Sequence, residues 1–332
     1  MAFALLVASC ESSDVDFPDY TFQTVYFPVQ NPVRTLVLGE SRSDNSIDLD
    51  HAFTIGANVG GLYGNTQDRI LKIEYAPELV DNLVSGTEPL AVLPQNYYSA
   101  SSLDEIVIPA GSFDGRIRID LTDEFFNDPA TVGLKYVIPL LISPVTKDSI
   151  LTGKPVVENP LRVLDSDWEP GFTPKDYTLF AVKYINRYHG TYLHRGTDEL
   201  LDATGTVIET KTYSETFIEE DLLTSVTTVS LSESTIDRLG GDNLGGVYQM
   251  KLKFNDDKSI VISGVEGGVA VSGTGTFKET DEGEVWGGTS HMTLYLDYTY
   301  TDNGGDKHHA TETMVYRDNA VIYEEFDVTI VE

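Results

Sequence analysis

Apolar and polar side chains alternate along much of this chain. The alternation is strict in residues 116–121 (RIRIDL) and continues through 247–254 (VYQMKLKF) and 291–300 (HMTLYLDYTY). Successive side chains of a β-strand point to opposite faces, so this period predicts antiparallel strands with one buried face. Glycine-rich turns separate these segments, as at residues 58–61 and 301–306. The pattern therefore predicts an all-β protein.

Two short segments depart from the alternation. Residues 76–84 (APELVDNLV) and 232–240 (SESTIDRLG) have Ser or Glu near their start and a glycine at or soon after their end, which is typical of capped helices. Short helices are predicted there. Between residues 154 and 174 the chain carries four prolines, which predict an extended connector between two domains.

The strand candidates on the two sides of this connector predict different architectures. Seven precede it, at 22–29, 33–40, 51–58, 69–75, 105–109, 115–121 and 135–144. That number of short strands is typical of an Ig-like β-sandwich. Nine follow it, at 177–188, 191–195, 206–218, 225–231, 246–254, 258–263, 268–277, 289–300 and 308–317. Consecutive hairpins of this kind close into an up-and-down antiparallel barrel, which leaves no sheet edge.

The predicted division of the chain follows from these features. Residues 1–19 form a signal remnant and tether, 20–155 the sandwich, 156–175 the linker, and 176–332 the barrel. Each of the two domains is long enough to bury a core of ordinary size.

The single cysteine, Cys10, follows a short apolar run and precedes an acidic segment. A transmembrane helix needs about 20 apolar residues, so the run is too short to span a bilayer. Residues 7–10 (VASC) resemble the bacterial lipobox, in which the cysteine after the cleavage site receives a diacylglycerol. No Lys or Arg precedes the run, so the natural chain is expected to begin further upstream. Cys10 is therefore the predicted lipidation site of an outer-membrane protein exposed at the cell surface.

The chain is strongly acidic, with 22 Lys and Arg against 53 Asp and Glu and a formal net charge of −31. Such a field repels polyphosphates, so nucleic acid is not an expected partner. It also repels anionic lipid, so attachment to a membrane is expected through the lipid anchor only.

Several segments together resemble a known family of surface proteins. Residues 24–40 (TVYFPVQNPVRTLVLGE) and 106–121 (IVIPAGSFDGRIRIDL) resemble the N-terminal Ig-like domain of Bacteroidetes surface lipoproteins of unknown function. That module also precedes some endo-β-N-acetylglucosaminidase barrels, whose DxxDxDxE string this chain lacks. Residues 183–196, 272–279 and 286–300 are similar to the lipocalin-like domains that often follow it. The resemblance implies an accessory binder for a glycan importer and implies no catalytic residues.

No catalytic, metal or cofactor motif is recognised. The glycine-rich stretch 56–64 is followed by a turn and a strand rather than the helix that a phosphate-binding loop requires. His308 and His309 are adjacent, so on a strand they point to opposite faces and cannot chelate one ion, and the HExxH string is absent. The chain is therefore predicted to be no enzyme and to need no cofactor.

Aromatic side chains near polar groups are the candidate ligand-binding residues, because sugar C–H faces stack on rings while hydroxyls need fixed polar partners. Trp286 follows Glu284 and precedes a glycine pair, and Tyr97 and Tyr98 lie in a polar loop. The alternative for each ring is core packing, as for Trp168 in the linker.

The chain is predicted to be a non-enzymatic surface lipoprotein of a polysaccharide-utilisation system that binds a neutral glycan. An outer-membrane importer complex is its expected protein partner. The alternative is a structural or adhesive lipoprotein that binds protein partners. An adhesive protein would show a long exposed edge strand or a large apolar patch.

Overall fold

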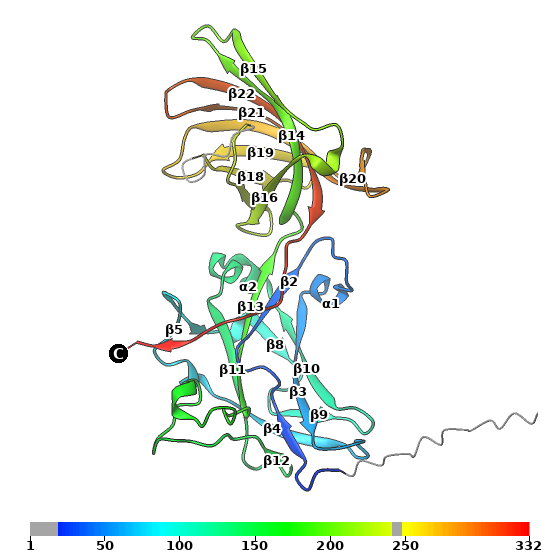
Figure 1. Cartoon of the computed structure of the whole chain (residues 1–332), viewed down its shortest axis with the longest axis vertical. Helices are drawn as coiled ribbons and strands as arrows, with labels where there is room; N and C mark the ends of the chain where they lie inside the picture. Colours follow the sequence, from blue (N-terminus) through cyan, green and yellow to red (C-terminus); the bar gives the residue numbers. More distant parts are fainter. Residues whose placement is uncertain (1–18, 241–247, 332) are drawn as a thin grey trace, which may run out of the picture.

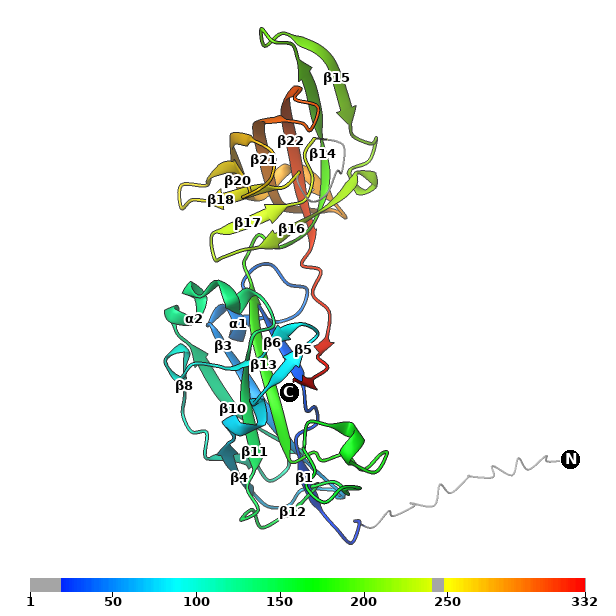
Figure 2. The same cartoon turned by 90° about the vertical axis from the view of Figure 1, so that its left-hand side faces the viewer.

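The computed structural model describes residues 19–240 and 248–331, so Cys10 lies outside the described residues. Two domains are stacked along the long axis of the molecule, a β-sandwich and a closed β-barrel (Figures 1 and 2). The prediction of an all-β chain with a sandwich and an antiparallel barrel is confirmed.

The sandwich is built from two sheets and a small accessory sheet. The first sheet has the order β12 (Ser149–Ile150), β1 (Thr24–Tyr26), β3 (Ala52–Gly60), β10 (Asp114–Leu121) and β8 (Tyr98–Ala100). The second has the order β23 (Glu324–Glu325), β2 (Pro32–Val37), β13 (Tyr177–Ile185), β11 (Tyr136–Ile142), β4 (Arg69–Tyr75) and β9 (Glu105–Ile108), with β7 (Ala91–Val92) beside β11. The accessory sheet contains β24 (Thr329–Ile330), β5 (Leu83–Ser85) and β6 (Glu88–Pro89).

Strand alternation produces the sandwich core. In β10, Ile117 and Ile119 are buried, while Arg116 and Arg118 beside them are exposed. The buried positions of both sheets meet in one cluster, whose largest members include Phe27, Phe53, Leu71, Ile106, Phe125 and Tyr184. The alternation of apolar and polar residues in the sequence thus directs the apolar side chains into the core between the two sheets.

Eight strands close the barrel. They are β14 (Gly190–Leu201), β16 (Leu222–Thr228), β17 (Glu233–Ile236), β18 (Met250–Phe254), β19 (Ser259–Gly264), β20 (Val271–Trp286), β21 (Thr289–Thr301) and β22 (Lys307–Asp318). Pairing of β14 with β22 closes the ring. A further strand, β15 (Val207–Tyr213), pairs with the second half of β14 and projects at the end away from the sandwich (Figures 1 and 2).

Helices are few and short. They are α1 (Ser46–Leu49) and α2 (Asp123–Asn127), with 3-10 turns η1 (Pro77–Val80), η2 (Gln95–Tyr97), η3 (Pro129–Val132), η4 (Asp165–Asp167) and η5 (Ile218–Glu220). No helix in the described part of the chain has the length and apolar character needed to cross a membrane.

Of the two predicted short helices, the one at residues 232–240 is wrong. Residues 232–240 contain β17, because Ser234 and Ile236 are buried in the barrel and pairing with β16 and β18 outweighs the capping pattern. The prediction at residues 76–84 is confirmed only as the 3-10 helix η1, because β5 begins at Leu83.

The observed domains differ from the prediction that the barrel begins at residue 176. Strand β13 pairs with β2 and β11 in the sandwich, and after the barrel the chain returns to pair β23 with β2 and β24 with β5. Seven of the nine β13 residues are buried, as is typical of a strand covered on both faces. The barrel is therefore an insertion into the sandwich, between β13 and β23.

The proline-rich stretch 156–175 is not an open linker. Trp168 is only 6% exposed, and its Nε1 donates a hydrogen bond to the Leu161 carbonyl at 3.0 Å. Arg162 pairs with the buried Asp176 at 3.1 Å. These contacts hold the segment in a folded loop, which is the packing role considered for Trp168.

The connecting segment that leads from β13 into the barrel is tied to both domains. The side-chain amide of Asn186, which is 1% exposed, donates to the carbonyls of Ser230 at 2.7 Å and Glu233 at 3.0 Å. On the sandwich side, Gly39 approaches Arg187 so closely that a Cβ at residue 39 would lie 2.7 Å from the Arg187 Cα. The junction therefore has defined packing on both sides.

Candidate functional site

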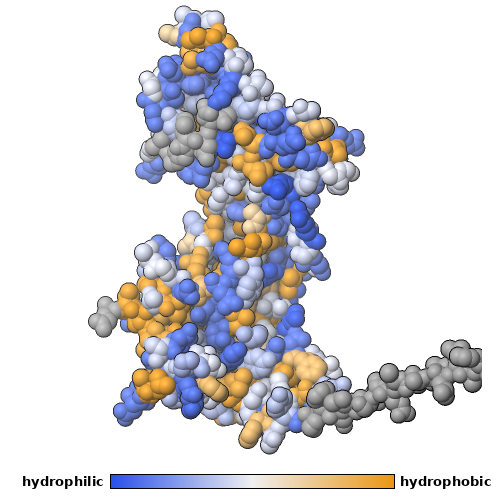
Figure 3. Space-filling model, viewed as in Figure 1, coloured by the Kyte–Doolittle hydropathy of each residue, from blue (hydrophilic) through white to orange (hydrophobic). Residues whose placement is uncertain are grey.

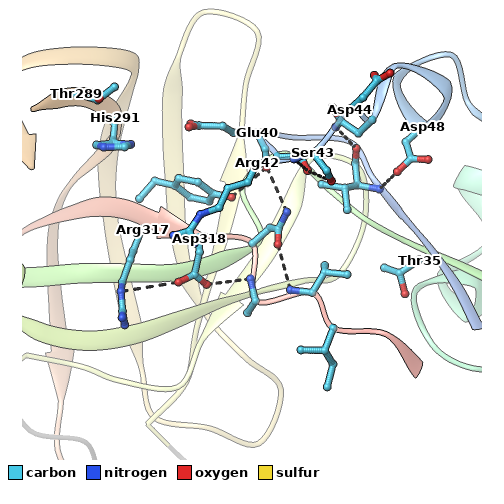
Figure 4. A pocket seen from close by; sticks show the side chains of 18 of the residues that line it. Thr35, Glu40, Arg42, Ser43, Asp44, Asp48, Thr289, His291, Arg317 and Asp318 are labelled. Atoms are coloured by element: carbon cyan, nitrogen blue, oxygen red, sulfur yellow. Dashed lines mark hydrogen bonds and ion pairs between the residues drawn. The ribbon is translucent and has the colours of Figure 1, made fainter. Parts of the chain in front are cut away.

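A cavity of about 740 Å³ lies between the two domains. Strand β2 and residues 40–48 line it from the sandwich, and the tip of the β20–β21 hairpin and the end of β22 line it from the barrel. In the space-filling view the molecule is narrow where the domains meet (Figure 3). Figure 4 shows Glu40 and Arg42 on one side of the cavity and Arg317 and Asp318 on the other. The volume of this cavity falls in the usual range for small-molecule binding sites, about 300–1,000 Å³.

Trp286 is the predicted ligand-binding residue that the structure brings to this cavity. It lies half-buried at the end of β20, before the turn formed by Gly287 and Gly288, whose φ angles of 59° and 78° suit glycine. Its ring stacks on His291 with centroids 4.5 Å apart and an interplanar angle of 17°. Its Nε1 donates to the Tyr316 carbonyl at 3.0 Å. The indole is thus held in one orientation at the cavity wall.

The sandwich wall of the cavity is fixed by a buried carboxylate. Asp48 of α1 is 2% exposed, pairs with Arg34, and accepts a hydrogen bond from the Val37 amide at 2.9 Å. Burial raises the pKa of Asp48 in spite of these contacts. The Asn45 amide bonds the carbonyls of Val37 at 2.9 Å and Gly39 at 3.0 Å. These bonds position the loop that carries Arg42.

The barrel wall contacts the same loop. The Tyr316 hydroxyl donates to the Glu40 carbonyl at 3.2 Å, and the Asn319 amide reaches the same carbonyl at 3.4 Å. Burial is the main cause that raises the pKa of Tyr316, so this hydroxyl stays protonated and can donate. The cavity therefore has walls from both domains that are joined by direct hydrogen bonds.

Charges of both signs surround the cavity. Arg34, Arg42, Arg317, Glu40, Asp44, Asp48 and Asp318 line it, so three cations face four carboxylates. Arg34 is engaged by Asp48, and Arg317 lies 3.8 Å from Asp318. Within residues 19–240 and 248–331, Arg42 forms no ion pair, and its side chain is exposed. The lining thus offers hydrogen-bond donors and acceptors without a large net charge.

The other predicted ligand-binding residues lie elsewhere. Tyr98 is 4% exposed in the sandwich core and bonds Gln95 at 3.2 Å. Tyr97 packs edge-on against Phe125 and bonds Asp128 at 3.0 Å. Neither tyrosine, nor Glu284 on β20, is among the residues that line the cavity. Of the four residues predicted to bind a ligand, Trp286 alone therefore lines the cavity, although Glu284 lies two residues before it on β20.

A buried polar cluster inside the barrel was not predicted. Glu312 of β22 is 1% exposed and accepts hydrogen bonds from the hydroxyls of Tyr213 at 2.7 Å and Tyr298 at 2.8 Å. His194, which is fully buried, places its Nε2 3.1 Å from the same carboxylate. Burial is the main cause that raises the pKa of both tyrosines, so they remain donors.

A second carboxylate, Asp198 of β14, extends this cluster. It accepts a hydrogen bond from the Tyr300 hydroxyl at 2.9 Å and lies 3.2 Å from the His308 Nδ1. The parity of the strand pattern could have revealed the cluster, because Glu312 shares its face with the apolar Ala310 and Met314. A glutamate at a buried-face position of an alternating strand indicates a buried polar contact.

The two adjacent histidines do point to opposite faces. His308 stacks on Tyr300 inside the barrel, whereas the His309 ring bonds Glu199 and Asp297 on the outside. Those two hydrogen bonds raise the pKa of His309, Asp297 contributing most. Among the described residues, no group of three or more His, Cys, Asp or Glu side chains could hold a metal ion.

Family models of known proteins match a segment in each of the two domains. A family model described as an N-terminal domain matches residues 20–149, and the domain of unknown function DUF5627 matches residues 187–320. The second match coincides with the inserted barrel. No curated protein matches the chain.

A solved structure defines the family more closely. The chain is 34% identical to a Bacteroides ovatus protein of unknown function, with a TM-score of 0.83 over 94% of this chain and 100% of that one. The chain belongs to the same family as this B. ovatus protein. A Bacteroides thetaiotaomicron protein described as an auxiliary nutrient binding protein is 14% identical over 85% of this chain and 90% of that one, with a TM-score of 0.37. A similarity that weak carries no argument about this chain.

Proposed function

We propose that this chain is a non-enzymatic, lipid-anchored surface protein that binds a neutral oligosaccharide in the cavity between its two domains. The observation that carries the proposal is the fixed indole of Trp286 at the wall of a 740 Å³ cavity. A flat ring held in place can stack on the C–H face of a pyranose with little loss of conformational entropy.

The polar lining supports a polyhydroxylated ligand. Arginines donate hydrogen bonds and carboxylates accept them, and sugar hydroxyls can do both. The cavity is lined by three cations and four carboxylates, and the whole chain carries a net charge of −31. A uronate or sulfated chain would be repelled by this field, so a neutral glycan fits better.

The proposed location depends on Cys10. A diacylglyceryl group at this residue would hold the protein at the outer membrane, where an importer complex could take up the captured glycan. Palmitate labelling of full-length protein in a Gram-negative host tests the anchor. We expect label in the natural sequence and none in Cys10→Ala, and equal labelling of the two would contradict the anchor.

The glycan site is tested by titration calorimetry against glycans selected on an array. Trp286→Ala should lower affinity by at least about 1 kcal/mol, as truncation of a central aromatic contact does. Val285→Ala is the matched control, because Val285 is the exposed neighbour on the same hairpin and does not line the cavity. An unchanged affinity in a folded Trp286→Ala protein would contradict a glycan site at this indole.

The alternative of a protein-binding adhesive chain is supported by β15. Within the part of the chain that the structure describes, this strand pairs with β14 alone, and six of its seven residues are exposed, including Val207 and Ile208. An exposed edge strand can accept an extended segment of a partner. Ile208→Lys would reduce protein binding under this alternative and leave glycan binding unchanged.

A further inference from the structure

The end of the sandwich farthest from the barrel exposes large aromatic side chains. Tyr20, Phe22 and Tyr63 are 79%, 73% and 78% exposed. Two further apolar side chains on the loops of this end, Phe113 and Val145, are 44% and 72% exposed. Soluble proteins rarely leave large apolar side chains together at a surface unless the surface meets a partner.

Hydrogen bonds hold these loops together. The Tyr20 amide donates to the Gly61 carbonyl at 3.0 Å, and the Tyr63 amide donates to Asp19. In the same turn, the side-chain amide of Asn65 donates hydrogen bonds to the carbonyls of Pro109 and Ser112, both at 2.9 Å. The loop that carries Val145 leads into β12, which pairs with β1 beside them. We call these five side chains the aromatic tip, since three loops and the first described residues bring them to one end.

The chain enters the sandwich at this tip. Residue 19 is the first described residue, and the segment that starts there lies at the end opposite the barrel (Figures 1 and 2). Only residues 11–18 separate it from Cys10. Eight extended residues span at most about 28 Å, less than the thickness of a bilayer with its headgroups. A lipid on Cys10 would therefore keep the tip beside the membrane surface.

We propose that the aromatic tip rests in the interfacial layer of the phospholipid bilayer to which Cys10 anchors the chain. This inference depends on the lipid anchor proposed above. Tyrosine prefers the membrane interface, where its ring is in an apolar and its hydroxyl in a polar environment. Insertion of the tip into this layer would direct the long axis of the molecule away from the membrane and leave the interdomain cavity exposed to solvent.

The experiment replaces the natural lipid, so it does not depend on cellular acylation. Because Cys10 is the single cysteine, full-length unacylated protein can be coupled through it to a maleimide lipid in phosphatidylcholine vesicles. Phe22→Trp reports on the tip, and brominated acyl chains quench tryptophan that enters the bilayer. Ile208→Trp is the matched control, since Ile208 is 63% exposed on β15 at the opposite end.

We expect brominated lipid to remove a large part of the Phe22→Trp emission and none of the Ile208→Trp emission, after subtraction of the unsubstituted protein. Equal Phe22→Trp emission in brominated and ordinary vesicles would overturn the proposal. Hydrogen exchange of the unsubstituted protein gives a second readout, with slower exchange at residues 20–23 and 60–65 after coupling. Failed palmitate labelling in cells would count against the anchor, whereas absent quenching and unchanged exchange would count against the tip.

Discussion

At the scale of single residues, two carboxylates, Glu312 and Asp198, organise the polar part of the barrel interior. Glu312 accepts hydrogen bonds from Tyr213 and Tyr298 and lies beside His194, and all four side chains are buried. Removing one member of a buried polar group leaves its partners desolvated and unpaired, which costs more than the bond itself.

Glu312→Ala should therefore lower the free energy of unfolding by about 2–6 kcal/mol, because it leaves the buried hydroxyls of Tyr213 and Tyr298 without their acceptor, at about 1–3 kcal/mol each. Tyr298→Phe should cost less, about 1–3 kcal/mol, because it removes one donor to Glu312 and the acceptor of the Gly240 amide. Urea unfolding followed by circular dichroism measures both. A Glu312→Ala protein as stable as the natural one would show that the cluster is not structural.

A second prediction at this scale concerns His189 at the domain junction. Its Nδ1 accepts a hydrogen bond from the Thr228 amide at 3.1 Å. Burial lowers the pKa of His189, and nearby Lys183 lowers it further. Because the pKa is lower in the folded state, the folded chain binds fewer protons than the unfolded chain as pH falls below about 6.5.

The stability associated with neutral His189 is thus fully present above the unfolded pKa and is lost as the pH falls through the folded pKa. His189→Gln should flatten the fall of unfolding free energy between about pH 7 and 5, by at most about 1.4 kcal/mol per pH unit. His309→Gln is a control of opposite sign, because the raised pKa of His309 adds stability that is lost as pH rises. Identical pH profiles for His189→Gln and the natural chain would contradict the prediction.

At the scale of elements, the strand pattern predicted most of the fold. Alternation at 116–121 and 291–300 corresponds to β10 and β21, where hydrophobic burial alone decides which face is inward. The pattern could not show that β13 belongs to the sandwich, because a strand buried on both faces reads the same beside any neighbour. Trp286 was predictable from its glycine pair, but its position in one cavity with residues 40–48 depends on how two distant domains dock.

The loop between β2 and α1, which contains Gly39, gives another prediction at this scale. A Cβ at residue 39 would lie 2.7 Å from the Arg187 Cα, and backbone cannot easily move aside. Gly39→Ala should destabilise the chain by about 1–3 kcal/mol, as overpacking does, and should weaken glycan binding by shifting the wall that carries Arg42. Gly64→Ala is the control, since no atom lies within 4 Å of its added Cβ. Thermal unfolding and calorimetry measure the two effects, and equal behaviour of the two variants would refute the prediction.

At the scale of the whole molecule, the barrel is an insertion, so the sandwich is assembled from residues on both sides of it. Phe326 and Val328, after the barrel, pack with Leu179 and Ala181 of β13 on the outer face of the second sheet. The apolar cluster on the outer face of the second sheet is therefore incomplete until the C-terminal segment has been added.

This topology makes a prediction about fragments. A fragment of residues 19–175 ends where the sequence alone predicts a domain boundary, but it lacks β13, β23 and β24. Without β13, both β2 and β11 lose a partner, and their buried side chains are exposed, so the fragment should be unfolded. Residues 186–323, which contain the complete barrel, should fold alone. Circular dichroism and amide proton dispersion in NMR spectra measure folding of both, and a folded 19–175 fragment would show that β13 is dispensable to the sandwich.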